Sequence, residues 1–200
     1  MDKKISGILL SAGKSERMGE MKALLPIKDK VVIEKLILEY LSVPLEELVV
    51  VLGFNAKKLK PFIEGLFNSE TLRIVINEDY EKGMYSSIVK GVEATKYDDV
   101  LLGLVDQPLI NKDIITKLIN AYDSNHIVIP SYKGIGGHPV LFPKFVKETI
   151  LSKEFSTLKE VFEHFKDKIL YVESGVEVTL DMDTKEDYEK ILNYIDGGII

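Results

Sequence analysis

The sequence contains no cysteine in its 200 residues and only three histidines. Without cysteine the chain forms no disulfide bond, offers no thiolate nucleophile and holds no metal through sulfur. The three histidines, His126, His138 and His164, are scattered along the chain, which argues against a zinc site built from histidine alone.

The sequence also lacks long apolar runs and an excess of positive charge. No apolar run reaches 18 residues, and no signal-peptide pattern opens the chain. Acidic residues outnumber basic ones by 32 to 26, a net charge of −6, whereas nucleic-acid binding requires a basic face. We therefore expect a cytoplasmic protein without nucleic-acid or membrane partners. A small anionic ligand stays possible, because it needs only a few local cations.

Short apolar runs alternate with stripes of helical period along the whole chain. Continuous apolar strands are typical of a parallel sheet covered on both faces, so we predict a doubly wound α/β fold with a mostly parallel central sheet. No repeat or linker is visible, and residues 1–200 are treated as one domain. The expected strands are 5–10, 48–52, 72–76, 100–105, 127–130, 140–142, 168–172 and 176–180, and the expected helices are 31–41, 56 onward with a break at Pro61 left open, 83 onward, 111 or 112 onward, 143–151, 158–165 and 185–195.

The most informative stretch comes after the first expected strand. Leu10–Gly13 leads into a small-residue loop that carries three cations, Lys14, Arg17 and Lys22. Such a loop presents backbone N–H groups to a phosphate, and glycine lets the backbone approach closely. Arg17 can clamp two phosphate oxygens, and Lys22 can add a mobile charge. An ordinary strand-to-helix turn with solvated charges is the alternative.

This stretch, from Leu10 to Pro26, resembles the signature L-x-A-G-x-S-x-R-M-G-x-x-K-x-L-L-P of the molybdopterin nucleotidyltransferases, the NTP transferases related to molybdenum cofactor cytidylyltransferase. Ser11 stands where alanine is commoner. The resemblance implies a Rossmann-like three-layer sandwich of glycosyltransferase-A type, whose loop binds the triphosphate of an incoming nucleotide. The nucleotide-binding residues that it implies here are Leu10, Ser11, Ala12, Gly13, Ser15, Arg17 and Lys22, and Lys22 and Arg17 are also implied to be catalytic.

A second family signature, an asparagine followed by G-M-x-x-S-[IVL], fits Asn77, Gly83 and the residues up to Ile88. It implies that Asn77, Gly83, Ser86 and Ser87 border the base or ribose. Capping of the helix by Ser86 or Ser87 is the alternative.

Asp106-Gln107-Pro108 comes after the fourth buried strand, where ligands gather in open parallel sheets. Asp106 is therefore placed as a ligand for Mg²⁺ beside phosphates, with a helix cap or a turn residue as the alternative. D-Q-P matches a third family signature, in which the aspartate binds the metal and counts among the catalytic residues.

The run Gly137-His138-Pro139-Val140-Leu141-Phe142 matches a fourth signature, associated with the acceptor side of the cleft. The resemblance makes Gln107, Pro108, Gly137 and His138 candidate acceptor-binding residues. His138 is at least as readily a structural hydrogen-bonding residue as a general base, and the inferred reaction needs no base because a phosphate monoester is largely ionised at pH 7.

The segment from Asp181 to Tyr188 matches a fifth signature, D-[IM]-D-T-x-E-D-[YL]. Asp181 or Asp183 could reach a metal opposite Asp106, and we favour Asp183. Thr184 and Asp187 also have the spacing of a helix-capping pair.

The five signatures together imply a Mg²⁺-dependent nucleotidyltransferase that moves CMP from CTP to the terminal phosphate of molybdenum-molybdopterin and releases pyrophosphate. A molybdoenzyme that receives the product is the partner that this activity implies. Guanylyltransferase relatives carry L-A-G-G where this chain has Leu10–Gly13, so the methyl group of Ala12 favours a pyrimidine base. The alternatives are transfer to another small acceptor, namely a sugar phosphate, a polyol phosphate or phospholactate, and a non-catalytic cofactor-binding protein on the same fold.

Overall fold

The computed structural model describes residues 3–198. Its strands are β1 (Ile5–Ser11), β2 (Pro26–Ile27), β3 (Lys30–Val31), β4 (Glu47–Leu52), β5 (Leu72–Ile76), β6 (Asp99–Leu104), β7 (Ile127–Tyr132), β8 (Ile135–Gly136), β9 (Val140–Phe142) and β10 (Ile169–Glu173). Its helices are α1 (Val32–Leu41), α2 (Ala56–Leu66), α3 (Met84–Ala94), α4 (Lys112–Ala121), α5 (Lys144–Ser152), α6 (Leu158–His164) and α7 (Lys185–Ile195).

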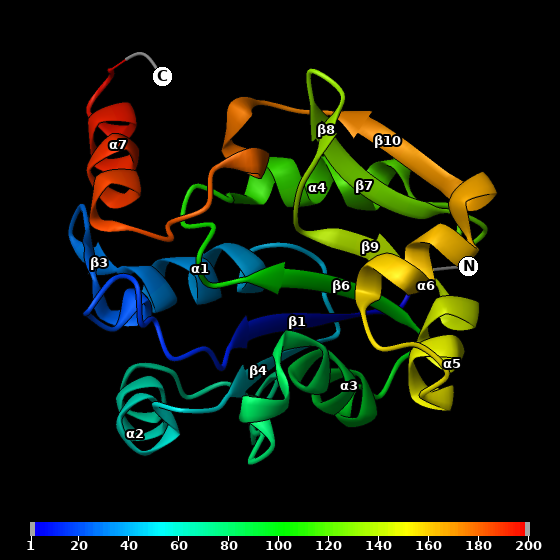
Figure 1. The fold of residues 1–200 in the computed structure, drawn as a ribbon, viewed down its shortest axis with the longest axis horizontal. Helices are drawn as coiled ribbons and strands as arrows, with labels where there is room; N and C mark the ends of the chain where they lie inside the picture. The colour runs from blue at the N-terminus through cyan, green and yellow to red at the C-terminus, as the bar shows by residue number, and fades with distance from the viewer. Residues whose placement is uncertain (1–2, 199–200) are drawn as a thin grey trace.

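The described strands form an eight-stranded sheet in the order β10-β7-β9-β6-β1-β4-β5, with β8 paired to β7, and a separate β2–β3 ribbon. β1 pairs in parallel with both β4 and β6, and β9 runs antiparallel to its neighbours β6 and β7. The prediction of a mostly parallel α/β sheet is therefore confirmed. The arrowheads of β1 and β6 point toward the side where β3 and α7 lie (Figure 1).

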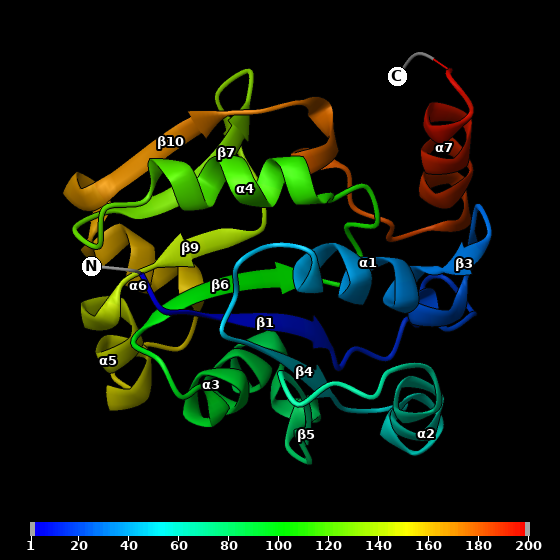
Figure 2. The same ribbon diagram turned by 180° about the vertical axis from the view of Figure 1, so that it is seen from behind.

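Helices cover both faces of the sheet, as Figures 1 and 2 show from opposite sides. One apolar cluster joins α1, α2 and α4 to one face, and a second joins α3, α5 and α6 to the other. β1 and β4 are buried along their whole length, as strands between two helical layers must be.

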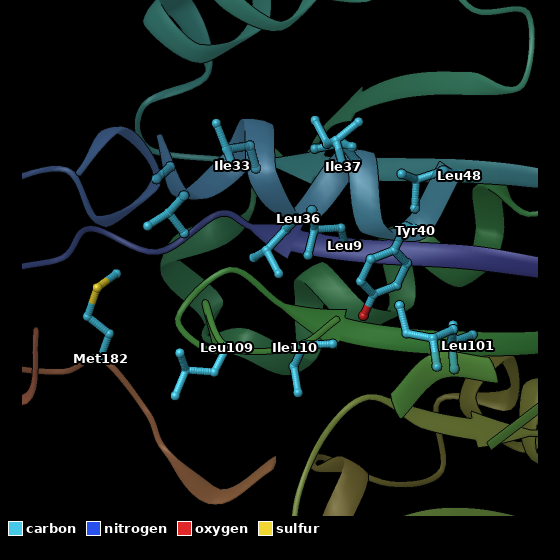
Figure 3. Close-up of a cluster of buried hydrophobic side chains, with 14 of the residues drawn as sticks. Leu9, Ile33, Leu36, Ile37, Tyr40, Leu48, Leu101, Leu109, Ile110 and Met182 are labelled. Carbon is cyan, nitrogen blue, oxygen red and sulfur yellow. The ribbon is translucent and has the colours of Figure 1, made fainter. Parts of the chain in front are cut away.

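The first cluster extends as far as the carboxyl ends of the strands. Figure 3 places Ile33 and Leu36 of α1 near Leu9 of β1, and it places Met182 beyond them at the far end of the cluster. The Met182 side chain is fully buried. The chain just before α7 is thereby anchored in the core beside the end of β6.

One local prediction is wrong, and the structure decides one alternative that the sequence left open. Residues Val176–Thr179 form a 3₁₀ turn and not a strand, because Val178 turns into the core and packs against Gly137. The helix that begins at Ala56 continues through Pro61, since its buried face, which includes Leu59 and Ile63, holds it against the sheet.

Of the two helix caps considered from the sequence, one is present in the structure and one is not. Thr184 caps α7 in a reciprocal capping box with Asp187, as expected. α3 begins after Gly83, and neither Ser86 nor Ser87 caps it. Ser86 instead donates to the carbonyl oxygens of Asp79 and Gly83.

No helix within residues 3–198 has the length and apolar character needed to cross a membrane.

Candidate functional site

The strands β6, β1, β4 and β5 lie side by side and end at the same edge of the sheet. Their last residues and the segments after them surround a cavity of about 290 Å³. β1 contributes the loop that begins at Ala12, and β6 contributes Asp106. The predicted nucleotide-binding residues that line this first cavity are Leu10, Ser11, Ala12, Gly13, Ser15, Lys22, Gly83 and Ser87. Segments distant in sequence therefore meet where the open-sheet rule expects a ligand.

A second cavity of about 360 Å³ adjoins the first, with which it shares Ala12, Gly13, Ser15, Lys22 and Tyr80. Arg17 and Asp183 line this second cavity. Among the residues described by the structure, no protein acceptor takes the backbone N–H groups of residues 13–17. A methyl group added at Gly13 would meet nothing within 4 Å, so this loop leaves space and donors for an anion.

Both predicted catalytic cations are held by Asp183. Arg17 Nη2 lies 2.7 Å from Asp183 Oδ2, and Lys22 Nζ lies 2.7 Å from Asp183 Oδ1. Hydrogen bonding with Lys22 is the main cause that lowers the pKa of Asp183. Lys22 Nζ is also 3.8 Å from Asp106 Oδ2, so one lysine lies between the two predicted metal ligands.

Asp106 is poorly satisfied by the protein. Its Oδ1 atom is buried and has no hydrogen-bond partner within residues 3–198. Burial raises its pKa to about 6 in spite of Lys22, and the nearby charges of Asp181 and Asp183 add to the rise. A buried oxygen without a donor, among other carboxylates, fits a ligand for a hard divalent cation.

Within the described residues, no group of three or more histidine and acidic side chains is positioned to hold a metal ion. Magnesium commonly takes only one or two carboxylates and completes its coordination from phosphates and water. Asp106 with Asp183 is compatible with that mode, although Asp183 is engaged by the two cations in this structure.

Asn77 and Ser86 line neither cavity. The Asn77 side chain is buried, and its Nδ2 atom donates to Ser86 Oγ and Ser87 Oγ, both at 2.9 Å. Its Oδ1 atom accepts from the N–H of Asp79 at 3.0 Å. Asn77 therefore fixes the start of α3, and of these residues Ser87 reaches the first cavity.

Three of the four predicted acceptor-binding residues gather around the segment from Val178 to Asp181. Gln107 Nε2 donates to Asp181 Oδ1 at 2.8 Å, and a methyl group on Gly137 would lie 1.7 Å from Val178 O. Burial lowers the pKa of His138 to about 4, so its ring is neutral at pH 7. Pro108, which directly follows Gln107, lines a different depression together with residues of α1 and α7.

Sequence reasoning missed Asn55, Leu59 and Tyr80, which line the first cavity together with Met84 of the second signature. Asn55 lies just beyond the end of β4 and begins α2, so the rule that ligands gather at carboxyl ends could have identified it. Glu81, also missed, lies 3.0 Å from Lys14 and thereby engages the third loop cation.

The β1 loop is locked against the residues just after β4. Phe54 N–H donates to Ala12 O at 3.2 Å, and a methyl group on Gly53 would lie 2.5 Å from that same oxygen and 2.9 Å from Ala12 Cβ. Only glycine at position 53 permits this approach. The Ala12 methyl group thus lies close to the Gly53 backbone as well as at the cavity wall.

Residues 7–167 match the family model described as the MobA-like NTP transferase domain. The chain is 27% identical to the molybdenum cofactor cytidylyltransferase of Escherichia coli over 188 residues, which cover 92% of this chain and 93% of the relative. It is 26% identical to a probable molybdenum cofactor guanylyltransferase of Bacillus cytotoxicus, covering 95% of this chain and 97% of that protein.

A third relative has a different kind of name. Nicotine blue oxidoreductase of Paenarthrobacter nicotinovorans is 30% identical over 157 residues, covering 74% of this chain and 75% of the relative.

Among solved structures, a nucleotidyl transferase from Methanothermobacter thermautotroptrophicus superimposes with a TM-score of 0.84 at 21% identity, covering 98% of this chain and 99% of that one. That neighbour supports the glycosyltransferase-A-type fold expected from the sequence.

Proposed function

This chain belongs to the family of MobA-like NTP transferase domains, and we propose that it transfers CMP from CTP to the terminal phosphate of molybdenum-molybdopterin. The observation that carries the proposal is the convergence of the open loop amides, Lys22 and Asp106 around one cavity. The relation to molybdenum cofactor cytidylyl- and guanylyltransferases over nearly the whole of both chains supports the acceptor, and the choice of base rests on Ala12.

The proposed reaction exchanges one phosphorus–oxygen bond for another. An oxygen of the acceptor's terminal phosphate attacks the α-phosphorus of CTP, and the bond to the β-phosphate oxygen breaks, so that pyrophosphate leaves. Lys22, Arg17 and the loop N–H groups bind the β- and γ-phosphates and stabilise the charge that builds on the leaving group. The side chains around Gln107 and His138 bind the acceptor, with His138 neutral.

Mg²⁺ is part of the proposal, with Asp106 and Asp183 as the residues that would hold it. When bound, the ion supplies charge neutralisation on the phosphates. The orphaned Oδ1 atom of Asp106 supports this assignment.

The decisive experiment incubates the purified protein with Mg²⁺, each NTP in turn and molybdopterin, and measures pyrophosphate and the dinucleotide product. We expect CTP to give the cytosine dinucleotide. Product with a sugar phosphate, a polyol phosphate or phospholactate would replace the acceptor but keep the reaction class. No pyrophosphate with any NTP and acceptor would favour a non-catalytic role or other chemistry, since the relation to an oxidoreductase indicates that similar sequences are not confined to nucleotidyl transfer.

A further inference from the structure

The Asp183 carboxylate forms ion pairs with both cations, Arg17 and Lys22, to which the proposed function assigns the triphosphate. Asp183 uses its two oxygens separately, Oδ2 for Arg17 and Oδ1 for Lys22, each at 2.7 Å. The Lys22 side chain is only 13% exposed, so its charge is not freely hydrated. A phosphate that approaches these two cations must therefore compete with Asp183.

The backbone around Asp183 is fixed on both sides. The N–H of Met182 donates to Asp106 O at 2.7 Å, and the Met182 side chain is buried in the core. On the other side, Thr184 and Asp187 form the capping box of α7. An exchange of partners at Asp183 must for this reason occur by rotation of its side chain, which stays close to the phosphates after it lets go of the cations.

The displaced carboxylate would then face an anionic ligand at short range. Like charges at that distance repel, and Asp106 and Asp181 already add negative charge to the same region. A divalent cation that arrives with the triphosphate removes this conflict, because it gives the displaced carboxylate a new partner.

From this geometry we propose that Asp183 is a positioning residue that keeps Lys22 and Arg17 occupied until a metal-bound triphosphate arrives, so that the site discriminates against metal-free nucleotide. The inference rests on the proposed function, since it concerns the same triphosphate. It assigns to Asp183 an exchange of partners, from two cations to the metal, in addition to the ligand role.

The two cavities also offer a matched control. Lys14 lies 3.0 Å from Glu81 on the rim of the second cavity, but their side chains are 37% and 68% exposed. Such an exposed pair contributes little, and Glu81 is not among the proposed metal ligands. Glu81→Gln therefore weakens the hold on one loop cation, which still has Glu16 Oε1 3.9 Å away, without touching the proposed exchange.

The experiment measures equilibrium binding of inorganic triphosphate, and in parallel of CTP, by calorimetry with EDTA and with Mg²⁺. For Asp183→Asn we expect metal-free triphosphate to bind about ten- to a hundredfold more tightly than to wild type, because the uncharged amide keeps only one acceptor oxygen and competes less with the ligand for Lys22 and Arg17. We expect the gain on adding Mg²⁺ to be smaller than in wild type. Glu81→Gln should change both conditions by the same small factor.

The outcomes separate the inference from its premise. Equal or weaker binding of metal-free triphosphate by Asp183→Asn would overturn the inference alone, because it would mean that Asp183 does not compete with the phosphates for Lys22 and Arg17. Absence of any NTP or triphosphate binding by wild type would overturn the proposed function and the inference with it. Asparagine has the same shape as aspartate, and unfolding curves check that the variants are folded. Asp183→Ala is a second variant, for which we also expect tighter binding of metal-free triphosphate than to wild type.

Discussion

Two carboxylates at opposite ends of the sheet have opposite environments. Glu47, at the amino end of β4, is 3% exposed and accepts hydrogen bonds from Ser6 Oγ at 2.8 Å, Arg73 Nη2 at 2.6 Å and the N–H of Lys96 at 2.5 Å. Asp106, just after the carboxyl end of β6, keeps one buried oxygen without any partner in the described structure.

Their pKa values move in opposite directions, because hydrogen bonds offset burial at Glu47 and do not at Asp106. Burial opposes the charge of Glu47, but the hydrogen bonds from Lys96, Ser6 and Arg73 outweigh it and lower its pKa. At Asp106 burial prevails and raises the pKa to about 6. A carboxylate whose hydrogen bonds are complete serves the fold, whereas one left incomplete at a ligand-binding edge is available to a ligand.

The largest effect should come from neutralising each carboxylate in turn. Asp106→Asn should keep the fold and abolish metal-dependent turnover, since an amide is a poor ligand for a hard dication. Glu47→Gln should lower the free energy of unfolding by about 2 kcal/mol, because it removes the charge that pairs with the partly exposed Arg73 and leaves one of the donors around residue 47 without an acceptor. Turnover and chemical denaturation of both variants measure this contrast. Metal-independent turnover in wild type, or an active Asp106→Asn variant, would contradict the assignment of Asp106 as a metal ligand.

Lys22→Ala tests the cationic side of the same site. If Lys22 stabilises the triphosphate charge in the transition state, turnover should fall by about 10²–10³ with little change in stability. Steady-state pyrophosphate release measures the loss, and Lys57→Ala, which removes an exposed lysine of α2, is the control. Full activity of Lys22→Ala would remove this residue from the mechanism.

The third prediction concerns the choice of nucleotide base and Ala12, an uncharged residue that lines the first cavity. A difference of one methyl group is worth about 1–3 kcal/mol, so we expect CTP to be preferred over GTP by about ten- to two-hundredfold. Ala12→Gly should relax this preference without inverting it, and because Ala12 Cβ also lies close to Gly53, unfolding should be monitored in parallel. Competition between equal CTP and GTP decides the matter. Preferred GMP incorporation by wild type would contradict the cytidylyl assignment.

The smallest expected effect is on stability as pH changes in metal-free buffer. The pKa of Asp106 is higher in the folded state than in the unfolded state. The protonated carboxyl therefore adds to the free energy of unfolding at low pH, and this contribution is lost as pH rises through about 6. Asp106→Asn should therefore gain on the order of 1 kcal/mol relative to wild type between about pH 4.5 and about pH 7.5. Denaturant unfolding at several pH values measures the gain. A constant difference across that range would contradict the buried environment of Asp106.

Features that depend on local pattern are largely predictable from the sequence by itself. The fully apolar runs of β1 and β4 predict strands buried on both faces, and the position of Asp106 after β6 predicts its place at the ligand edge. Thr184 and Asp187 predict a helix start, because the capping box involves residues only three apart. The alternating pattern of residues 176–180 was misleading, since burial of Val178 against Gly137 selected a 3₁₀ turn.

The tertiary structure decided which partner each polar side chain takes. Asn77 uses its donors on Ser86 and Ser87, and Asp183 binds Lys22, which lies 161 residues away in the sequence. Both asparagine and aspartate can satisfy many partners, so their type and spacing leave the choice open. The choice depends on where the folded chain carries donors and acceptors within about 3 Å of one another, which sequence periodicity does not encode.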